Sequence, residues 1–224
     1  MNQIWLNAVR ASARAAVAPW WLAGGAPMPL AAYQPINAVD YAASLVNLAN
    51  PGTFNAAPGV TPTWASGTGW GFNGTTQHLT TGITAQSGVN YIFVIRFSNL
   101  DSGDSRSIFG AVGNVDWRIE ISPIFSGGNG RYIYTSVVDT SAASATAGVV
   151  ALSNTNVYLN GSSVTSFDPT SITSTSPHAL FIGARNNNGV ANQHALGNIQ
   201  AVAIYSSTLT ASQVAAVSAA MAAL

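Results

Sequence analysis

The stretch 197–214, GNIQAVAIYSSTLTASQV, constrains the fold more than any other part of the chain. Residues 199–205 are β-branched, aromatic or small and contain no proline, which predicts a strand. Alternation predicts that its side chains divide between two faces, with Ile199, Ala201, Ala203 and Tyr205 on one and Gln200, Val202 and Ile204 on the other. Both faces are largely apolar toward the end of the strand, so we expect it to be covered on both sides.

A short helix is predicted to follow this strand. The sequence Thr210-Ala211-Ser212-Gln213 fits a capping box, in which the Thr hydroxyl accepts from the first turn and Gln213 reaches back. Val214, Val217 and Met221 then recur at helical spacing. The chain is therefore expected to place a core strand directly before an alanine-rich helix.

Four stretches in this order resemble motifs of the laminin-G-like, concanavalin A-like jelly-roll family. They are GFNG at 71–74 with QHL at 77–79, VYLNG at 157–161, LFIG at 180–183, and the strand and helix start at 197–214. The resemblance implies an all-β, two-sheet antiparallel jelly-roll sandwich over residues 36–224, with a short C-terminal helix. It also implies glycan binding as an activity.

Charge is scarce along the whole chain. Charged residues make up 6%, there is no Lys, and Glu120 is the only Glu. Such a surface repels other copies poorly, which favours a protein that is assembled with partners, as a homo-oligomer or with other subunits, or that lies outside the cell. The net charge is +0 without basic clusters, which argues against nucleic-acid binding, and the absence of Cys excludes disulfides.

Residues 1–35 are predicted to form an arm that anchors the protein to a neighbouring subunit. Residues 2–17 are expected to be helical up to Pro19, and residues 20–29 are expected to be extended and apolar. Trp5, Trp20, Trp21 and Leu22 would either pack on the sandwich of their own chain or dock into a neighbour, and the sequence leaves both open. Proline and glycine interrupt residues 15–33, so no membrane span is predicted.

Most of the remaining signals indicate strands. Residues 91–97 are a continuous apolar run around Arg96, residues 107–112 are a further candidate, and residues 115–122 alternate between apolar and polar. Residues 126–130 predict a turn that leads into a strand at 131–138, and Asn160-Gly161 predicts a tight hairpin. Residues 39–51 predict a short helix or a turn.

The carboxylates do not suggest catalysis. Glycoside hydrolysis needs two carboxyl groups about 5–10 Å apart. Asp116 and Glu120, the closest local pair, would lie about 13 Å apart on one strand face at about 3.3 Å per residue. Arg118 lies between them, and a positive neighbour opposes a neutral general acid. We therefore expect a surface ladder of charges, joined by Arg131 across the hairpin, and no enzyme activity.

No metal site or cofactor is expected. His78, His178 and His194 are far apart in sequence, and no carboxylate stands at ligand spacing from them. The segment Asp101-Ser102-Gly103-Asp104 resembles a calcium-ligand cluster and equally resembles a plain turn, so calcium stays an open alternative.

A polar loop between two predicted core strands is the candidate glycan site. It contains Asn186, Asn187, Asn188, Asn192, Gln193 and His194, whose side chains can exchange hydrogen bonds with sugar hydroxyls. The alternative interpretation is a loop filled with turn-forming residues.

These features favour a non-enzymatic structural protein of a phage virion, either a capsid decoration or a tail-associated lectin-like module. A surface suited to the outside of a cell, without a convincing secretory signal, is typical of a particle released by lysis, so we expect the virion surface. The alternative is a free carbohydrate-binding adhesin domain of a cell, and a third option is a polysaccharide hydrolase.

Overall fold

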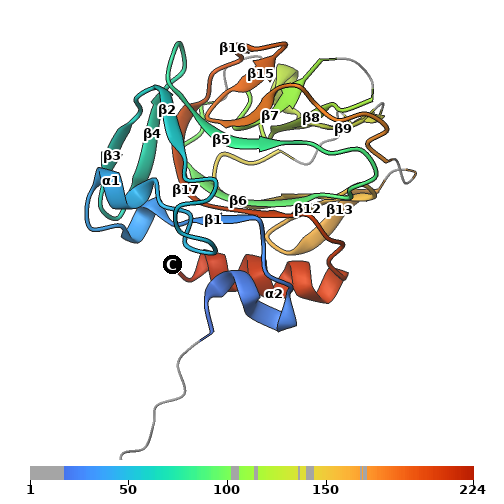
Figure 1. The fold of residues 1–224 in the computed structure, drawn as a ribbon, viewed down its shortest axis with the longest axis horizontal. Helices are drawn as coiled ribbons and strands as arrows, with labels where there is room; N and C mark the ends of the chain where they lie inside the picture. The colour runs from blue at the N-terminus through green and yellow to red at the C-terminus, as the bar shows by residue number, and fades with distance from the viewer. Residues whose placement is uncertain are drawn as a thin grey trace, which may run out of the picture.

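The protein is a sandwich of two β-sheets with a helical layer on one side (Figure 1). The computed structural model describes residues 18–101, 106–113, 116–135, 137–139 (backbone only), 144–166, 168 and 171–224. The two-sheet all-β prediction is confirmed, and the sheets are antiparallel apart from short parallel pairings at β15 and at Ser107. The predicted helix over residues 2–17, with Trp5, lies outside the described residues.

The first sheet contains most of the motifs that identified the fold. Its strand order within the described residues is β13 (Ser162–Ser166), β12 (Asn156–Leu159), β11 (Gly148–Leu152), β6 (Ile92–Ser98), β17 (Leu196–Tyr205), β4 (Gly69–Asn73) and β3 (Thr63–Ala65). Strands β1 (Ala31–Tyr33) and β4 pair with the same edge of β17: β4 with its first half and β1 with its second half. Asn160 and Gly161 both have positive φ at the β12–β13 turn, which confirms the predicted hairpin.

The second sheet carries a small additional hairpin on its outer side. Its order is β10 (Val137–Asp139), β9 (Arg131–Tyr134), β8 (Ile119–Ser122), β7 (Phe109–Val112), β14 (Ala179–Ile182), β5 (His78–Thr84) and β2 (Ala57–Val60). Strands β15 (Arg185–Asn187) and β16 (Val190–Asn192) form the hairpin, and β15 also pairs with β7. Figure 1 places this hairpin on the side of the sandwich opposite the helix α2.

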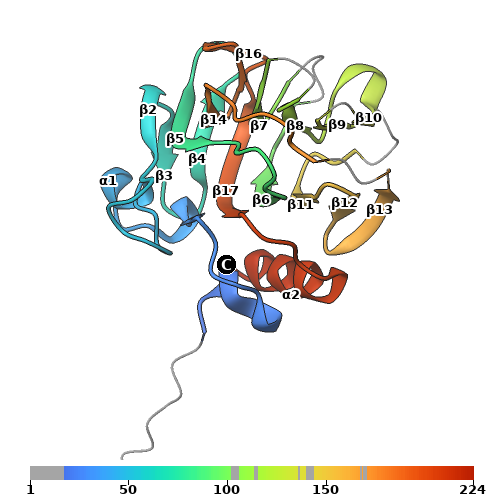
Figure 2. The same cartoon turned by 45° about the vertical axis from the view of Figure 1, so that its right-hand side comes forward.

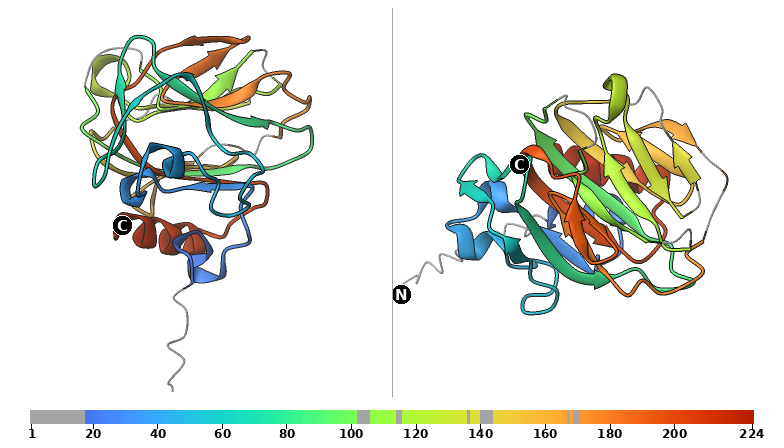
Figure 3. Two further views of the ribbon diagram at one scale, coloured as in Figure 1. Left: turned by 60° about the vertical axis from the view of Figure 1, so that its left-hand side comes forward. Right: turned by 90° about the horizontal axis from the view of Figure 1, so that it is seen from above.

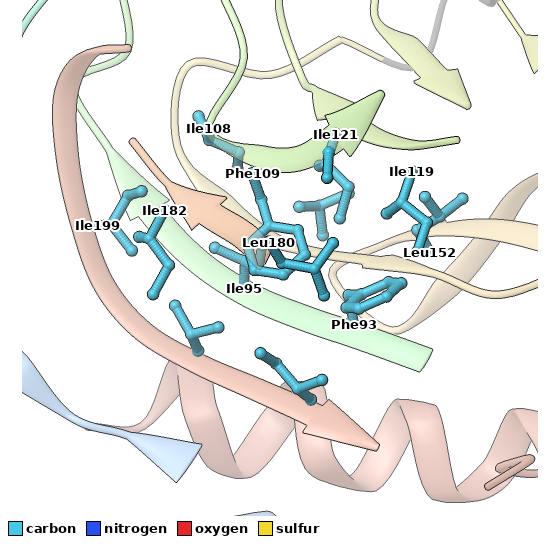
Figure 4. Close-up of a cluster of buried hydrophobic side chains, with 14 of the residues drawn as sticks. Phe93, Ile95, Ile108, Phe109, Ile119, Ile121, Leu152, Leu180, Ile182 and Ile199 are labelled. Atoms are coloured by element: carbon cyan, nitrogen blue, oxygen red, sulfur yellow. The ribbon is translucent and has the colours of Figure 1, made fainter. Parts of the chain in front are cut away.

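The main core lies between the two sheets, where large side chains from both interdigitate (Figure 4). Phe93 and Ile95 of β6 face Phe109 of β7 and Leu180 of β14, and none of the four is exposed. The rings of Phe93 and Phe109 lie 5.0 Å apart between centroids. Apolar alternation along each strand thus becomes one continuous core.

Strand β17 is buried on both faces, as predicted, but the faces are not those that simple alternation gives. Its register against β6 shifts between Ile199 and Ala201. A bulge adds one residue to a strand and reverses the faces beyond it. Ile199 therefore points into the main core together with Val202, whereas Ala201 points to the outer side. This corrects the predicted grouping of Ile199 with Ala201.

The outer side of β17 is covered by the helix α2 (Ala211–Ala222) and by the 3-10 helix η1 (Trp20–Gly25), as Figures 1 and 2 show. The capping box at Thr210 and Gln213 is confirmed, with both reciprocal hydrogen bonds present. Arg96, inside the apolar strand β6, donates from Nη1 to the Met221 carbonyl at 3.2 Å. A cation beside the helix C-terminus also stabilises the helix dipole.

The described part of the predicted arm lies on the sandwich, and its segment Trp20–Gly25 is a 3-10 helix. Trp20 and Trp21 are 8% and 9% exposed and pack with α2 in a second apolar cluster, against which Leu22 is partly buried. Trp20 Nε1 donates to Gln34 Oε1 at 2.8 Å. Burial of two indoles explains the 3-10 helix in place of the extended chain that we expected. Trp20 and Trp21 therefore pack on their own chain, which was one of the two alternatives. Docking of the arm into a neighbouring subunit stays a prediction.

Two short helices complete the edge of the first sheet. The 3-10 helix η2 spans Pro35–Asn37, and α1 spans Tyr41–Ser44, inside the segment predicted to hold a short helix or turn. Asp40 caps α1 by accepting from the Ala43 amide at 2.7 Å. A third 3-10 turn, η3 (Ser126–Gly128), connects β8 to β9 at the predicted turn. The views in Figure 3 show how these segments lie around the two sheets and the helical layer.

Candidate functional site

The polar loop predicted from the sequence is the hairpin β15–β16 with the two residues that follow it. Its residues do not all behave alike. Asn186 is 3% exposed, donates to the Ala179 carbonyl and accepts from the Gly189 amide, so it shapes the turn. Asn187 is half-buried and Asn188 is exposed with a φ of 52°, as a turn residue would be. For Asn186 the turn-forming interpretation is therefore the one the geometry supports.

The other half of the loop joins an ionic network around Glu120. The Glu120 carboxylate accepts from Arg131 through Oε1 and from Arg185 through Oε2, the latter at 3.1 Å. Ser122 Oγ also donates to Oε1 at 2.9 Å. Glu120 is completely buried, whereas each arginine side chain is 15% exposed. The hairpin that carries Arg185 covers this part of the second sheet.

This network corrects the surface ladder of Asp116, Arg118 and Glu120. The ion pair between Glu120 and Arg131 across the β8–β9 hairpin is confirmed, but it is not at the surface. Strand β8 begins only at Ile119, so Asp116 lies in a turn before it rather than on the same strand face. The β15–β16 hairpin covers Glu120 through Arg185. Because Arg185 follows Glu120 by 65 residues, the local sequence pattern did not indicate this burial.

Two predicted site residues hold the arginines in place. Gln193 Oε1 accepts from Arg131 Nη2 at 2.8 Å, and Asn192 Oδ1 accepts from Arg185 Nε at 3.0 Å. The guanidinium of Arg131 also stacks on Phe125, with Cζ 3.6 Å from the ring centroid. His194, the last predicted residue, lies beside the carbonyl oxygen of Gln77, with its Nδ1 at 3.3 Å. The structure thus brings Asn192 and Gln193 together around a charged centre.

A separate open trough lies on the outer side of the first sheet, beyond the part that α2 covers. Its volume is about 330 Å³. Gly71 of β4 and Asn198 of β17 are paired across the sheet, while their neighbours Phe72 and Ile199 point into the core. The trough is lined by Thr63, Gly71, Phe72, Asn73, Gln77, Asn99, Leu196, Gly197 and Asn198.

The trough is rich in free amide groups above a glycine floor. Within the described residues, no hydrogen bond is formed by the side-chain amides of Gln77, Asn99 or Asn198. A Cβ on Gly71 would lie 2.5 Å from Thr63 Oγ1 and 3.3 Å from Asn198 Oδ1, so only glycine leaves this floor open. Free amides offer both donors and acceptors to a ligand.

Sequence reasoning missed this trough because its lining comes from four separate segments: β3, β4 with the turn after it, the residue after β6, and the start of β17. The motif that resembled the family, GFNG at 71–74, supplied three of the lining residues without indicating a site. Asn and Gln residues that are far apart in sequence form no recognisable motif, and only the folded structure brings them together.

The remaining candidate groups form no recognisable centre. In the described ranges, no group of three or more His, Asp or Glu residues could hold a metal ion. His78 and His194 approach to 6.0 Å between ring centroids, but His178 contacts Trp117 instead. Asp101 pairs with Arg106 at 3.4 Å, and Asp104 of the calcium alternative lies outside the described residues. None of the described helices has the length and apolar character needed to cross a membrane.

Comparison with known families agrees with the two-sheet architecture. The sequence model described as the concanavalin A-like lectin/glucanases superfamily matches residues 83–215, which is more than half of the chain. The chain belongs to the concanavalin A-like lectin/glucanase superfamily. In this superfamily member the match spans β6 to β17 and thus includes most of both sheets. No curated protein matches the chain.

Solved structures with this fold include modules of carbohydrate-active proteins. Domain 4 of AbnA, an extracellular GH43 arabinanase of Geobacillus stearothermophilus in complex with arabinotriose, is 16% identical, with a TM-score of 0.52 over 85% of this chain and 98% of that domain. A mutant of the Trypanosoma rangeli sialidase is 14% identical, with a TM-score of 0.55 over 74% of this chain. The chain spans about 30% of that sialidase. At these identities the likeness shows the fold.

Proposed function

We propose that this superfamily member is a non-enzymatic glycan-binding module whose sugar site is the trough on the first sheet. The observation that carries the proposal is the set of unpaired amides of Gln77, Asn99 and Asn198 around the glycine floor. A sugar hydroxyl both donates and accepts hydrogen bonds, and an amide side chain can accept through its oxygen and donate through its NH₂ group. The membership of the superfamily and the arabinotriose-bound domain of similar fold support the same class of ligand.

The shape of the trough suits a short run of sugar residues. At about 330 Å³ it is a shallow surface feature of the size of a small-molecule site. The exposed Leu196 side chain offers an apolar contact for a sugar face beside the amides. A second hollow of similar size, about 310 Å³, has a more apolar lining of Leu30, Phe54, Ile83 and Val89 beside Thr84, Gln86, Tyr91 and Ser206. The Gln86 amide there already donates to Thr84.

Binding is tested by titrating the full chain with a panel of neutral oligosaccharides that includes arabinotriose. Asn198→Ala and Gln77→Ala each remove one amide and should weaken binding about fivefold, for roughly 1 kcal/mol per hydrogen bond. Asn37→Ala is the matched control, because Asn37 is an exposed amide on η2 outside the trough. Equal affinity in all four proteins would place the sugar elsewhere, and no binding to any glycan would refute the proposal.

Lack of catalysis is part of the proposal. Glu120, the only Glu, has both carboxylate oxygens held by arginines and is sealed from solvent, which suits neither a general acid nor a nucleophile. Hydrolysis of any polysaccharide in a broad panel by the purified protein, lost in Glu120→Gln, would establish the enzyme alternative instead.

We further propose that the module is a subunit of a phage virion, as a decoration or tail-associated protein on the particle surface. The 6% content of charged residues supports an assembled protein, because few charges keep copies apart. The alternative, a free adhesin domain of a cell, predicts a monomer in solution. The native mass measured by light scattering separates the two.

A further inference from the structure

The network on the second sheet carries more positive charge than it neutralises. Arg131 and Arg185 contribute two guanidinium cations against the single carboxylate of Glu120, which leaves one net positive charge. In the described part of the chain, neither arginine forms an ion pair with any other group. Each arginine side chain is 15% exposed, so this charge is largely buried but still accessible to solvent. Partial burial of an uncompensated charge strengthens its attraction for an anion.

The same network leaves several hydrogen-bond donors without a partner among the described residues. The amide oxygens of Asn192 and Gln193 already accept from the arginines, at 3.0 and 2.8 Å. The NH₂ groups of both amides form no hydrogen bond among the described residues and can donate to a ligand. Nη1 of Arg131 and Nη2 of Arg185 have no hydrogen-bond partner among the described residues. Four nitrogen donors of this one network therefore have no partner among the described residues, and we call them the arginine patch.

The patch is rigid. Phe125 supports the plane of the Arg131 guanidinium, and Gln193 and Glu120 fix its edge. Arg185 is fixed at Nε by Asn192 and at Nη1 by Glu120. Groups that are already held lose little side-chain entropy when a ligand binds.

We propose that these four donors bind the carboxylate of an acidic sugar residue. A carboxylate is planar and accepts several hydrogen bonds, which matches guanidinium edges flanked by NH₂ groups. A neutral hydroxyl gains less at this site, because it carries no negative charge to pair with the surplus guanidinium. A network that served only to pin the hairpin would need Glu120 but no surplus arginine. The proposal goes beyond the trough, which lies on the other sheet and has mixed donors and acceptors.

The test compares acidic sugars with their own neutral esters on the full chain. Trigalacturonic acid and 3′-sialyllactose are each titrated by calorimetry beside their carboxyl methyl esters. We expect at least one acid to bind tenfold or more tighter than its ester, and the difference to shrink at 0.5 M NaCl as charges are screened. Equal binding of acid and ester, or no binding of any acid, would overturn the proposal.

Two variants and one control variant test whether the effect arises at the patch. Gln193→Glu keeps an oxygen for Arg131 but replaces an NH₂ donor by a second oxygen and cancels the net charge, so it should abolish the preference for the acid. Asn188→Asp makes the same change of charge at the exposed tip of the same hairpin and should retain at least half of the preference. Arg185→Gln leaves the Glu120–Arg131 pair intact and should also remove the preference. A wild-type preference in Gln193→Glu, with an unchanged melting temperature, would refute the site.

Two further experiments separate this proposal from its alternatives, a general anion site and binding of acidic sugars in the trough. Sodium sulfate is titrated alone: if it binds as tightly as the acidic sugars with the same loss in Gln193→Glu, the patch is a general anion site and the sugar proposal is wrong. Asn198→Ala, in the trough, should leave the preference for acid over ester unchanged. Loss of the preference in Asn198→Ala would instead assign acidic sugars to the trough.

Discussion

The hydroxyl of Tyr205 donates to the backbone carbonyl of Trp21 at 2.8 Å, across 184 residues of sequence. Tyr205 ends β17 on the side that faces the helical layer, and Trp21 belongs to η1. This bond therefore fixes the start of the described chain to the strand at the centre of the first sheet. It also explains why the aromatic residues near the N-terminus are covered within their own chain.

Removing that hydroxyl tests how much the connection contributes. Tyr205→Phe should lower the free energy of unfolding by about 1–2 kcal/mol, because it leaves the buried Trp21 carbonyl without its donor. Urea unfolding at neutral pH measures the change. Tyr158→Phe is the control, since the Tyr158 hydroxyl has no hydrogen-bond partner among the described residues and its loss should change stability by less than about 0.5 kcal/mol.

The cap of α2 should also be measurable. Thr210→Ala removes the side-chain oxygen that accepts from the Gln213 amide and should cost about 0.5–2 kcal/mol. Gln213 also donates to the Gly25 carbonyl at 3.0 Å, so the cap connects α2 to the end of η1. Thr208→Ala is the same substitution at an exposed position just before the helix and should be nearly neutral. Equal losses in both variants would mean that the cap contributes nothing specific.

Truncation separates folding from assembly. Deletion of residues 1–17 should leave the unfolding midpoint unchanged and abolish any native assembly, if this segment with Trp5 is the anchor. Deletion of residues 1–28 also removes Trp20 and Trp21 from the face of α2, and should destabilise strongly, since loss of one buried Trp costs about 3–5 kcal/mol. Denaturant melts and native mass are measured on both. An assembly that survives the shorter deletion contradicts the anchor.

Alkaline pH should destabilise the fold through its buried tyrosines. Desolvation by burial raises the pKa of Tyr33, Tyr134 and Tyr205 well above the ordinary value of 10.0. The folded state therefore keeps phenol protons that the unfolded chain loses. This stabilisation is complete below pH 10 and is lost as the pH rises above 10 toward the higher folded-state pKa. The absence of Lys leaves Tyr as the main side chain titrating there.

The measurement is the urea midpoint between pH 8 and pH 11, which should be flat to about pH 9.5 and fall beyond it. Tyr205→Phe should show a shallower fall than wild type, relative to its own midpoint at pH 8. A midpoint that stays constant to pH 11 would contradict the assignment of the shift to burial.

Local signals predicted much of the fold. The capping box at Thr210, the Asn160-Gly161 turn and the apolar run of β6 all form as their sequences indicate, because each depends on residues close in the chain. The bulge beside Ile199 was not predictable in this way. Alternation assumes that no residue is inserted, and the insertion is fixed by pairing with β6.

The candidate sites depended on long-range packing. Glu120 alternates with apolar neighbours and so had the pattern of a surface residue, yet the hairpin containing Arg185 covers it. Asn192 and Gln193 were identified from composition, but their role as acceptors for arginines follows only from that packing. The trough assembles residues from four segments, and no window of sequence contains it.

The helical layer also sets the orientation of the molecule. The 3-10 helix η1 and the C-terminus both lie on the side of α2, while the β15–β16 hairpin lies on the far side (Figure 1). A tether joined at Leu224 would therefore hold the sandwich with its second sheet, which carries the arginine patch, facing outward. If many copies were attached in this way, the face left accessible on each would be the second sheet.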